Sequence, residues 1–436
     1  MSLTKVSPSL FATSNNITSV TVGGSANTIS LTFDGSGVIT SATNNAVSVA
    51  NTAITGNIIS SQIASVSGSV ITANTIANSA IQTGAVENYM SAAGLGFGMR
   101  NRIINGQMVL DQRNAGASVT PTNLSYNLDR WACLLTQSSK FTVQQNAGAV
   151  TPPVGFSKYL GATSSSAYSI VAGDRFGIYQ NIESFNGADL AWGTANAKSI
   201  TISFQVYSSL TGTFSGNLRT GSGTDYSYVF TYSIPVANTW TTISVTIAGP
   251  TVGTWASDNS TFVSVNFSLG VGSTYSTTAG SWTAGNYWGN SSAVSVVGTN
   301  GATFYITGVQ LEKGSTATSF DYRSYGAELA LCQRYYSALP DTGAQNGLGA
   351  GVCLNTSNFY FVAVYPVPMR TAPSFTSTGT FQVIVTTGYT PSSVTLSAAG
   401  TTSAALVAAI SGPVAASGGF IRGGGSACSL NFSAEL

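Results

Sequence analysis

The residues best suited to chemistry are aromatic and lie close together in a segment rich in glycine and asparagine. Within residues 281–290 (SWTAGNYWGN), Trp282, Tyr287 and Trp288 occur among small polar residues that include Asn286. Sugar rings have apolar C–H faces that stack on aromatic side chains, while asparagine amides bind their hydroxyl groups. Because a rigid β scaffold usually carries its binding residues on loops, we expect this segment to be a glycan-binding loop. The alternative is structural, with the same rings capping a hydrophobic core or packing between chains.

Two further polar and aromatic segments are weaker glycan-binding candidates. Tyr226 and Tyr228 lie in GTDYSY (residues 223–228), and Tyr360 follows the polar run NTSN at residues 355–358. A third segment places Arg422 among glycines at positions 418, 419 and 423–425. It resembles a phosphate-binding loop only in composition, because no Lys-Ser or Lys-Thr follows, so we expect a mobile or tightly turned loop.

The sequence offers little for catalysis. It contains no histidine, which excludes Ser-His-Asp and Cys-His mechanisms and histidine-ligated zinc. The four cysteines are far apart and form no CxxC motif, so we expect buried free thiols, no metal site and no cofactor. Glycan cleavage needs two carboxylates facing one site, and the 14 acidic residues are scattered. Asp174 and Glu183 are the first pair to test, although we do not expect an enzyme. The cysteines are Cys133, Cys332, Cys353 and Cys428.

Charge and hydrophobicity narrow the class of protein. Lys plus Arg is 15 and Asp plus Glu is 14, so the net charge is 15 − 14 = +1, and charged residues make up 7% of the 436 residues. Nucleic-acid binding needs clustered basic residues, so we expect no nucleic-acid partner. A hydrophobic content of 43% argues against disorder. Because no run of about 18 apolar residues occurs, we expect no membrane insertion, and no signal peptide is recognisable.

The first 98 residues contain a regular aliphatic repeat. Five aliphatic residues recur every five positions, with short polar residues between them, and an earlier run at positions 49, 54 and 59 is offset by two residues. A repeat that buries one aliphatic residue per unit cannot form a core alone. We favour a thin stalk in which identical chains, most simply three, each contribute one residue per layer. A single-chain β-solenoid and a flexible linker are the alternatives. The five residues are Val66, Ile71, Ile76, Ile81 and Val86.

Beyond residue 98 the pattern is that of a mainly β protein. Residues 200–206 alternate cleanly, which places Ile200, Ile202, Phe204 and Val206 on one face. Strand-like runs separated by Gly, Asn, Ser and Pro predict a jelly-roll β-sandwich over residues 99–322 and a smaller C-terminal β domain over residues 341–436. The expected strands are 103–110, 141–143, 200–206, 228–234, 241–247, 262–269 and 294–297 in the sandwich, and 359–367, 381–386, 394–398 and 428–432 beyond it.

Residues 304–336 are expected to close the sandwich and join it to the second β region. Ile306, Val309 and Leu311 supply β-branched and apolar residues around Gly308, which predicts a strand that continues through Glu312 and Lys313. Gly314 and Ser315 then form a turn. A linking helix within residues 323–340 is predicted to begin at about Tyr325. Leu329, Cys332 and Tyr336 would lie on one face of it.

Both ends of the sandwich resemble a known family. The opening motifs are NRIINGQM (residues 101–108), QR (112–113) and YNLDRW (126–131), and the closing motifs are FYITGVQLEKG (304–314), AT (317–318), Glu328 and CQRYY (332–336). Together they resemble the jelly-roll domains of phage tail fibres and other virion appendage proteins, over a little over half of the chain. Asp129 and Arg130 in this motif are expected to form a structural ion pair, with Trp131 in the core.

This resemblance implies a carbohydrate-binding-module-like jelly roll in a homotrimeric fibre on the virion. Such a fibre acts outside the host cell and adheres to a bacterial surface polysaccharide. Residues 1–98 would then attach to other virion tail or neck proteins and form the stalk. Two alternatives stay open: a purely structural appendage or capsid-decorating fibre without sugar affinity, and a tailspike-like enzyme that cleaves glycans.

Overall fold

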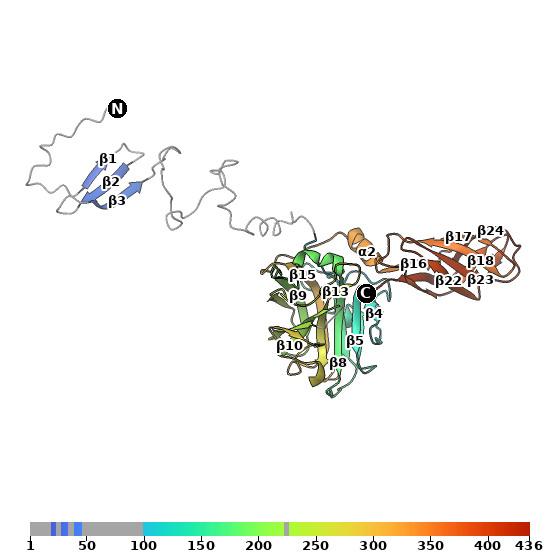
Figure 1. Cartoon of the computed structure of the whole chain (residues 1–436), viewed down its shortest axis with the longest axis horizontal. Helices are drawn as coiled ribbons and strands as arrows, with labels where there is room; N and C mark the ends of the chain where they lie inside the picture. The colour runs from blue at the N-terminus through green and yellow to red at the C-terminus, as the bar shows by residue number, and fades with distance from the viewer. Residues whose placement is uncertain (1–18, 23–27, 34–38, 46–98, 222–225) are drawn as a thin grey trace, which may run out of the picture. The chain divides into compact units, whose positions relative to one another are not determined.

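A computed structural model describes residues 19–22, 28–33, 39–45, 99–221 and 226–436 (Figure 1). The chain divides into two compact units, Met1–Gln82 and Thr83–Leu436. In the first unit, β1 (Ser19–Val22), β2 (Thr28–Phe33) and β3 (Ile39–Asn45) form an antiparallel sheet in sequence order. The predicted aliphatic repeat lies outside the described residues, so the stalk and the homotrimer stay predictions.

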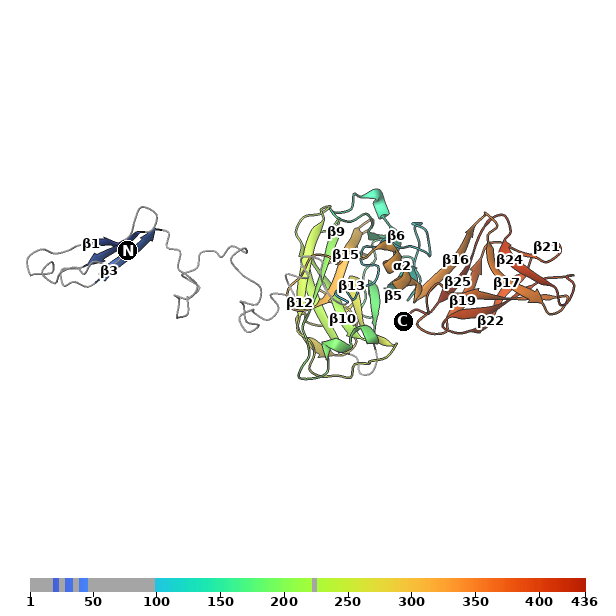
Figure 2. The same ribbon diagram turned by 90° about the horizontal axis from the view of Figure 1, so that it is seen from above.

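The second unit begins with a two-layer β-sandwich, which confirms the prediction of a mainly β, sandwich-like fold (Figures 1 and 2). One antiparallel sheet has seven strands in the order β14-β11-β10-β13-β8-β5-β4, and the other has five in the order β12-β9-β15-β7-β6. The alternating residues Ile202, Phe204 and Val206 of β9 are fully buried between them. Burying each such side chain contributes about 1.5–3 kcal/mol, so these inner faces hold the layers together. The strands are β4 (Tyr126–Leu128), β5 (Trp131–Leu135), β6 (Phe141–Gln145), β7 (Leu160–Ser164), β8 (Arg175–Glu183), β9 (Ile200–Ser208), β10 (Gly212–Thr220), β11 (Tyr226–Ile234), β12 (Thr241–Ile247), β13 (Thr261–Val271), β14 (Trp282–Ala284) and β15 (Thr303–Lys313), with short 3₁₀ turns at Ala147–Ala149, Ser184–Asn186, Ala188–Leu190 and Ser273–Tyr275.

Two of the predicted sandwich strands are wrong. Residues 103–110 form turns, because the Asn105 side chain takes the hydrogen bonds that a neighbouring strand would need. Its Nδ2 donates to the Leu110 carbonyl at 2.8 Å, and its Oδ1 accepts the Leu110 N–H at 3.0 Å. Residues 294–297 are irregular, although Val296 and Val297 are buried, since the N–H groups of these two valines both donate to the Leu269 carbonyl. Consecutive N–H groups of a strand point to opposite sides, so this arrangement cannot continue as a ladder.

The closing strand and the helix exist as predicted, but the helix is shorter. β15 is almost completely buried. At Gly308 its φ is +61° and an added Cβ would lie 2.6 Å from the Phe156 ring, which explains a glycine inside a buried strand. The helix α2 spans Tyr325–Gln333, and its Leu329 and Cys332 pack against the sandwich with Ile104 and Leu110. Tyr336, predicted on the same helix face, is instead the first residue of the next strand.

The C-terminal region is a second, smaller sandwich with its own core. A three-stranded sheet in the order β16-β25-β19 faces a seven-stranded sheet in the order β21-β20-β24-β17-β18-β23-β22. The glycine-rich segment around Arg422 is strand β24 rather than a loop, because its glycines allow close approach of neighbouring backbone: an added Cβ at Gly419 would lie 2.3 Å from the Ile384 carbonyl oxygen. The strands are β16 (Tyr336–Thr342), β17 (Gly347–Cys353), β18 (Asn358–Val364), β19 (Ser374–Thr378), β20 (Phe381–Ile384), β21 (Gly388–Tyr389), β22 (Ser393–Ala399), β23 (Ser403–Ala409), β24 (Gly418–Gly423) and β25 (Ala427–Ser433).

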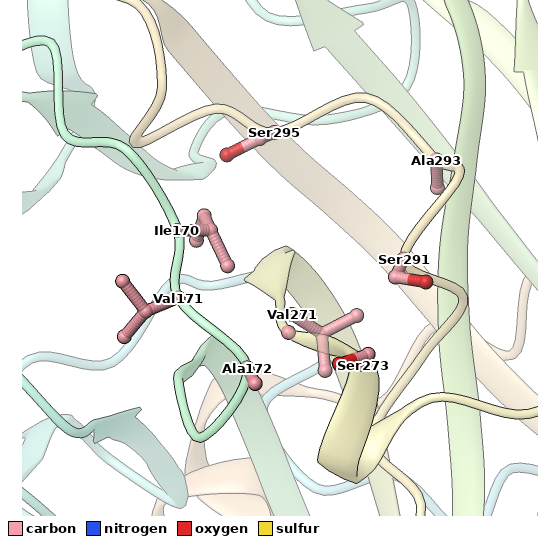
Figure 3. A pocket seen from close by; sticks show the side chains of 9 residues that line it. Ile170, Val171, Ala172, Val271, Ser273, Ser291, Ala293 and Ser295 are labelled. Carbon is pink, nitrogen blue, oxygen red and sulfur yellow. The ribbon is translucent and has the colours of Figure 1, made fainter.

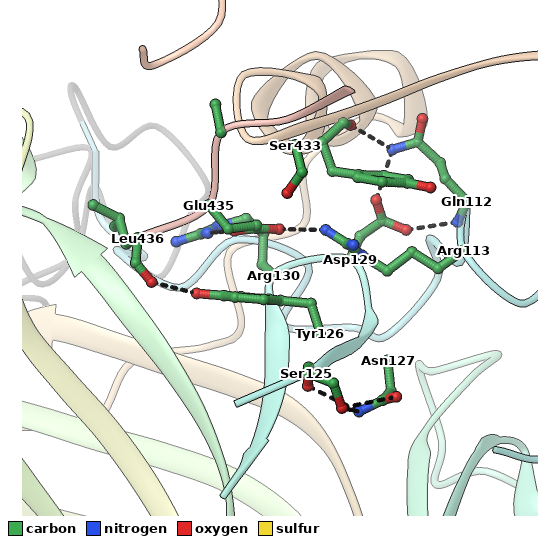
Figure 4. A network of polar contacts seen from close by, with 12 residues as sticks. Gln112, Arg113, Ser125, Tyr126, Asn127, Asp129, Arg130, Ser433, Glu435 and Leu436 are labelled. Atoms are coloured by element: carbon green, nitrogen blue, oxygen red, sulfur yellow. Dashed lines mark hydrogen bonds and ion pairs between the residues drawn. The ribbon is translucent and has the colours of Figure 1, made fainter. Parts of the chain in front are cut away.

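A buried polar network joins the end of the chain to the first sandwich (Figure 4). Trp131 is in the core as predicted, but the predicted Asp129–Arg130 ion pair is wrong. Arg130 pairs with Glu435, which also accepts a 2.7 Å contact from Arg113. Asp129 instead accepts hydrogen bonds from Gln112, through the backbone N–H and Nε2, both at 2.6 Å. The sequence reading failed because the partner of Arg130 lies 305 positions away.

Candidate functional site

The structure brings the two predicted aromatic groups of the sandwich together. β11 pairs with β14 at the edge of the seven-stranded sheet, with Tyr226 opposite Ala284 and Tyr228 opposite Trp282. The ring centroids of Tyr228 and Trp282 lie 5.6 Å apart. Residues 281–290 are therefore not a simple loop, since Trp282 begins a short strand. This cross-strand contact unites candidates that the sequence presented as separate.

Two further tryptophans complete the group. Trp255 lies 5.6 Å from Trp282 between ring centroids, and Trp192 lies beneath both, at 4.8 Å from Trp255 and 5.4 Å from Trp282. A Cβ placed on Gly253 would lie 3.3 Å from Nε1 of Trp255 and 3.4 Å from Cδ2 of Tyr226, so both rings border that glycine. Sequence reasoning missed Trp255, although its setting among Gly, Thr, Ser and Asn matches that of residues 281–290. We call the half-buried set Tyr226, Tyr228, Trp255 and Trp282 the edge aromatic surface.

Hydrogen bonds to the main chain hold the two indole rings of the edge aromatic surface. The indole N–H of Trp282 donates to the Ala248 carbonyl at 2.8 Å, and that of Trp255 donates to the Val252 carbonyl at 3.2 Å. Because these donors bind the protein itself, a ligand meets ring carbons rather than free N–H groups. Burial raises the pKa of Tyr228, so its hydroxyl stays neutral at physiological pH. Neutral rings held in place suit the C–H face of a sugar.

The other part of the predicted loop packs over the outer face of the seven-stranded sheet, where Trp288 is buried. Trp288 is only 5% exposed, and its indole N–H donates to Oδ1 of Asn286 at 2.6 Å. The main-chain oxygens of Tyr287 and Trp288 accept from Asn217 and Asn266 at 3.0 and 3.1 Å. The rings and amide of Trp288 and Asn286 are thus engaged with the protein, and Tyr287 stays half-exposed.

A second aromatic cluster covers the outer face of the five-stranded sheet. The rings of Tyr159, Tyr305 and Tyr207 stack in sequence, with centroids 5.2 and 5.3 Å apart. Trp240 packs against Tyr159 and Tyr207 at 5.5 Å from each, and its indole N–H donates to the Thr151 carbonyl at 2.8 Å. Tyr159 and Tyr305 are buried, so this cluster exposes less ring surface than the edge aromatic surface.

The remaining sequence candidates do not form sites around one ligand. Asn355 accepts the N–H of Ser357 at 2.9 Å in the turn between β17 and β18, while Tyr360 lies within β18. Arg422 donates to Oε1 of Gln382 at 2.8 and 3.1 Å rather than facing an anion. These contacts are those of ordinary turn and sheet residues.

The first carboxylate pair proposed for glycan cleavage is wrong. Asp174 precedes β8 and Glu183 ends it, so roughly 30 Å of strand separates them, far beyond the spacing of a glycosidase pair. Burial raises the pKa of Glu183, but hydrogen bonds from Arg334 and Tyr335 outweigh it and hold that pKa below its ordinary value. Burial also raises the pKa of Asp174, but hydrogen bonds from Val171, Tyr168 and Thr136 outweigh it and hold that pKa below its ordinary value. Both carboxylates are therefore ionised and committed to structure.

Thiol and metal chemistry find no support in the described part of the chain. All four cysteines are buried free thiols, as predicted, and burial raises the pKa of Cys133 to about 12. Among the described residues, no three His, Cys, Asp or Glu side chains gather into a possible metal site. Among these residues, no helix has the length and apolar character needed to cross a membrane.

A cavity of about 290 Å³ lies elsewhere on the sandwich, where two loop segments meet the end of β13 and the 3₁₀ turn that follows it (Figure 3). Its lining is small and neutral, with serine hydroxyls and aliphatic side chains but no aromatic ring and no charge. It offers neither a stacking surface nor an ion partner, so it is a weaker ligand site than the edge aromatic surface. The lining residues are Ile170, Val171, Ala172, Val271, Gly272, Ser273, Ser291, Ala293 and Ser295.

Comparison with known proteins finds no matching family model and no matching curated protein. Similar solved structures include the enzymatically active domain of tailspike protein 4 from bacteriophage CBA120, with 16% identity and a TM-score of 0.28. The match covers 52% of this chain and 23% of that one. This chain thus spans about a quarter of the tailspike chain.

Two sugar-binding proteins are also similar. The family 11 carbohydrate-binding module of the cellulase Lic26A-Cel5E of Clostridium thermocellum has 13% identity and a TM-score of 0.25, covering 47% of this chain and 99% of the module. A putative sugar binding protein from Bacteroides thetaiotaomicron has 12% identity and a TM-score of 0.29, covering 49% of this chain and all of that one (100%). At these scores the likeness assigns no ligand to this chain.

Proposed function

We propose that this protein is a receptor-binding appendage of a phage and adheres to a bacterial surface glycan through the edge aromatic surface. One observation carries the proposal: cross-strand pairing sets Tyr228 beside Trp282, with Trp255 and Tyr226 next to them, as fixed, half-exposed, neutral rings. Neutral rings suit the neutral polar surface of a polysaccharide better than they suit an ionic partner. The chain carries a net charge of +1, which fits a partner recognised without charge.

The proposed assembly is a homotrimer whose residues 1–98 form the stalk and attach to other virion tail or neck proteins. Its support is the five-residue aliphatic repeat, whose side chains neighbouring chains of a stalk would bury. Three weak glycan sites on one trimer act together, and avidity then exceeds the affinity of each site by roughly 10²–10⁴. A shallow aromatic surface is sufficient under those conditions.

Competition with infection tests this function. Purified full-length protein should bind the bacterial strain on which the parent phage grows, bind its extracted surface polysaccharide, and reduce phage adsorption at saturation. A structural appendage would do none of these, so saturating protein that neither binds nor blocks contradicts the proposal. Release of reducing ends or unsaturated sugars from the polysaccharide would instead indicate a tailspike-like enzyme.

A further inference from the structure

The seven-stranded sheet of the C-terminal region carries apolar residues on both faces. On β18, Phe359 and Phe361 point into the core, whereas Val362 and Val364 point outward and are 51% and 68% exposed. Antiparallel sheets with one solvent-facing side usually alternate apolar and polar residues. Strand β24 also has apolar residues on both faces, since Ile421 is buried and its neighbour Phe420 is 38% exposed. Within the described residues, nothing covers these outward side chains.

Strand register makes the outward apolar residues one continuous surface. Residues directly opposite one another on antiparallel strands point to the same face, with Cβ atoms about 5 Å apart. The apolar pairs span five neighbouring strands from β20 to β23. They are Ile384 with Phe420, Phe420 with Ala350, Val352 with Tyr360, Tyr360 with Val407, and Val362 with Ala405. We call this surface, together with Val364, the outer apolar face; such an exposed patch marks an interaction site.

The charge of the C-terminal region indicates what kind of partner fits. Its four acidic or basic residues are Asp341, Arg370, Arg422 and Glu435. Three of them bind backbone or partner side chains within the chain, and Arg422 donates to the neighbouring Gln382. A charged partner therefore finds little complementary charge here. Arg422 is the one charged residue on the outer apolar face, and its guanidinium already donates to Gln382, so a second copy of this largely apolar face is the partner that fits best.

The size of the outer apolar face decides how that copy is held. Five strands about 4.8 Å apart and about 20 Å long give a face of roughly 400 Å² in projection. Stable association of independent proteins buries about 800 Å² on each partner. The face is too small for that, but it suffices for a partner already held at high effective concentration. Copies joined through the N-terminal stalk meet this condition, so the inference rests on the proposed homotrimer.

We infer that the outer apolar face packs against the C-terminal region of a neighbouring copy within the homotrimer. The stalk gathers the chains, and this face then holds their C-terminal sandwiches together. The consequence for adhesion is geometric: fixed C-terminal regions set the spacing of the three glycan-binding sandwiches on the bacterial surface.

Thiol crosslinking in the full-length protein tests the contact. Val362→Cys places a thiol on the outer apolar face, and Thr376→Cys places a matched thiol on β19, an exposed strand of the opposite sheet. The four natural cysteines are buried, so a flexible bis-maleimide reacts with the introduced thiol. We expect Val362→Cys to give covalent dimers as the main product, because each chain has one reactive thiol and each reagent joins two, and Thr376→Cys to remain mostly uncrosslinked. Adding Val364→Glu to Val362→Cys should abolish the crosslink, because the contact would bury an unpaired carboxylate.

The outcomes separate this contact from the proposed function. If light scattering gives three copies per particle but Val362→Cys crosslinks no better than Thr376→Cys, the contact is wrong and the stalk stands. A monomeric mass for the full-length protein overturns both the homotrimer and the contact. If crosslinking succeeds while the protein fails to bind bacteria, the contact stands and adhesion is wrong.

Discussion

Replacing Trp255 and Tyr226 together with alanine should weaken binding of the full-length protein to the bacterial surface by about 100-fold or more. Both rings border Gly253, and Trp255 also packs on Trp192, as Trp282 does, so unfolding must be measured beside binding. A stacking ring contributes about 1.4 kcal/mol, which is tenfold in affinity, so two rings give about 100-fold per site. Avidity in a trimer enlarges the loss.

Trp240→Ala is the matched control for this double variant. Trp240 is also half-buried, lies in the same sandwich and donates its indole N–H to a main-chain oxygen. It belongs to the tyrosine cluster on the opposite sheet, so its loss should leave binding unchanged. Cell binding and thermal unfolding should be measured for both variants. Binding that survives in the double variant but fails in Trp240→Ala would move the glycan site to the tyrosine cluster.

Asp129→Asn should change how the stability of the protein depends on pH. Asp129 is fully buried, and burial raises its pKa from 3.8 to about 6, against the hydrogen bonds from Gln112 and the charge of Arg113. The folded protein therefore favours the protonated acid, and ionisation destabilises it. This loss of stability is absent below about pH 4, where the carboxyl is protonated in both states, and complete above about pH 6, where it is ionised in both. A shift of about 2 pKa units corresponds to about 3 kcal/mol.

Denaturant unfolding at several pH values measures this effect. As the pH rises from 4 to 7, the free energy of unfolding of the natural protein should fall by about 3 kcal/mol relative to that of Asp129→Asn. The new amide can add a difference of its own, but that difference does not change with pH. Asp258→Asn is the control of opposite sign. Hydrogen bonds from Ser260 lower the pKa of Asp258, so its small contribution is lost as the pH falls. A pH-independent difference between the natural protein and Asp129→Asn would show that this carboxyl titrates normally.

Local patterns in the sequence predicted much of the fold. The alternation of residues 200–206 identified a central strand whose apolar side chains are all buried, and the helix was located at its first residue, Tyr325. Both depend on neighbouring residues, which a sequence displays directly. The prediction failed at residues 103–110, whose hydrophobic residues suggested a strand. There the side chain of Asn105 makes the hydrogen bonds to the backbone of Leu110 that a neighbouring strand would otherwise make.

The site and the junction depend on residues that are distant in the sequence. Nothing local shows that Tyr228 and Trp282 lie on paired strands, because β12 and β13 intervene. Similarly, Arg130 finds its partner in Glu435, and the adjacent Asp129 suggested the wrong pair. Composition identified aromatic segments that the fold brings together, but only the pairing of strands separates the half-exposed Trp282 from the buried Trp288.

Oxidative footprinting with the extracted polysaccharide tests the glycan-binding role of the edge aromatic surface most directly, since it needs no substitution. Hydroxyl radicals oxidise exposed aromatic rings, and mass spectrometry locates each modified residue. With saturating polysaccharide, oxidation of Trp255 and Trp282 should fall while oxidation of Trp240 stays the same. Equal oxidation of Trp255 and Trp282 in the free and polysaccharide-bound protein would contradict this assignment.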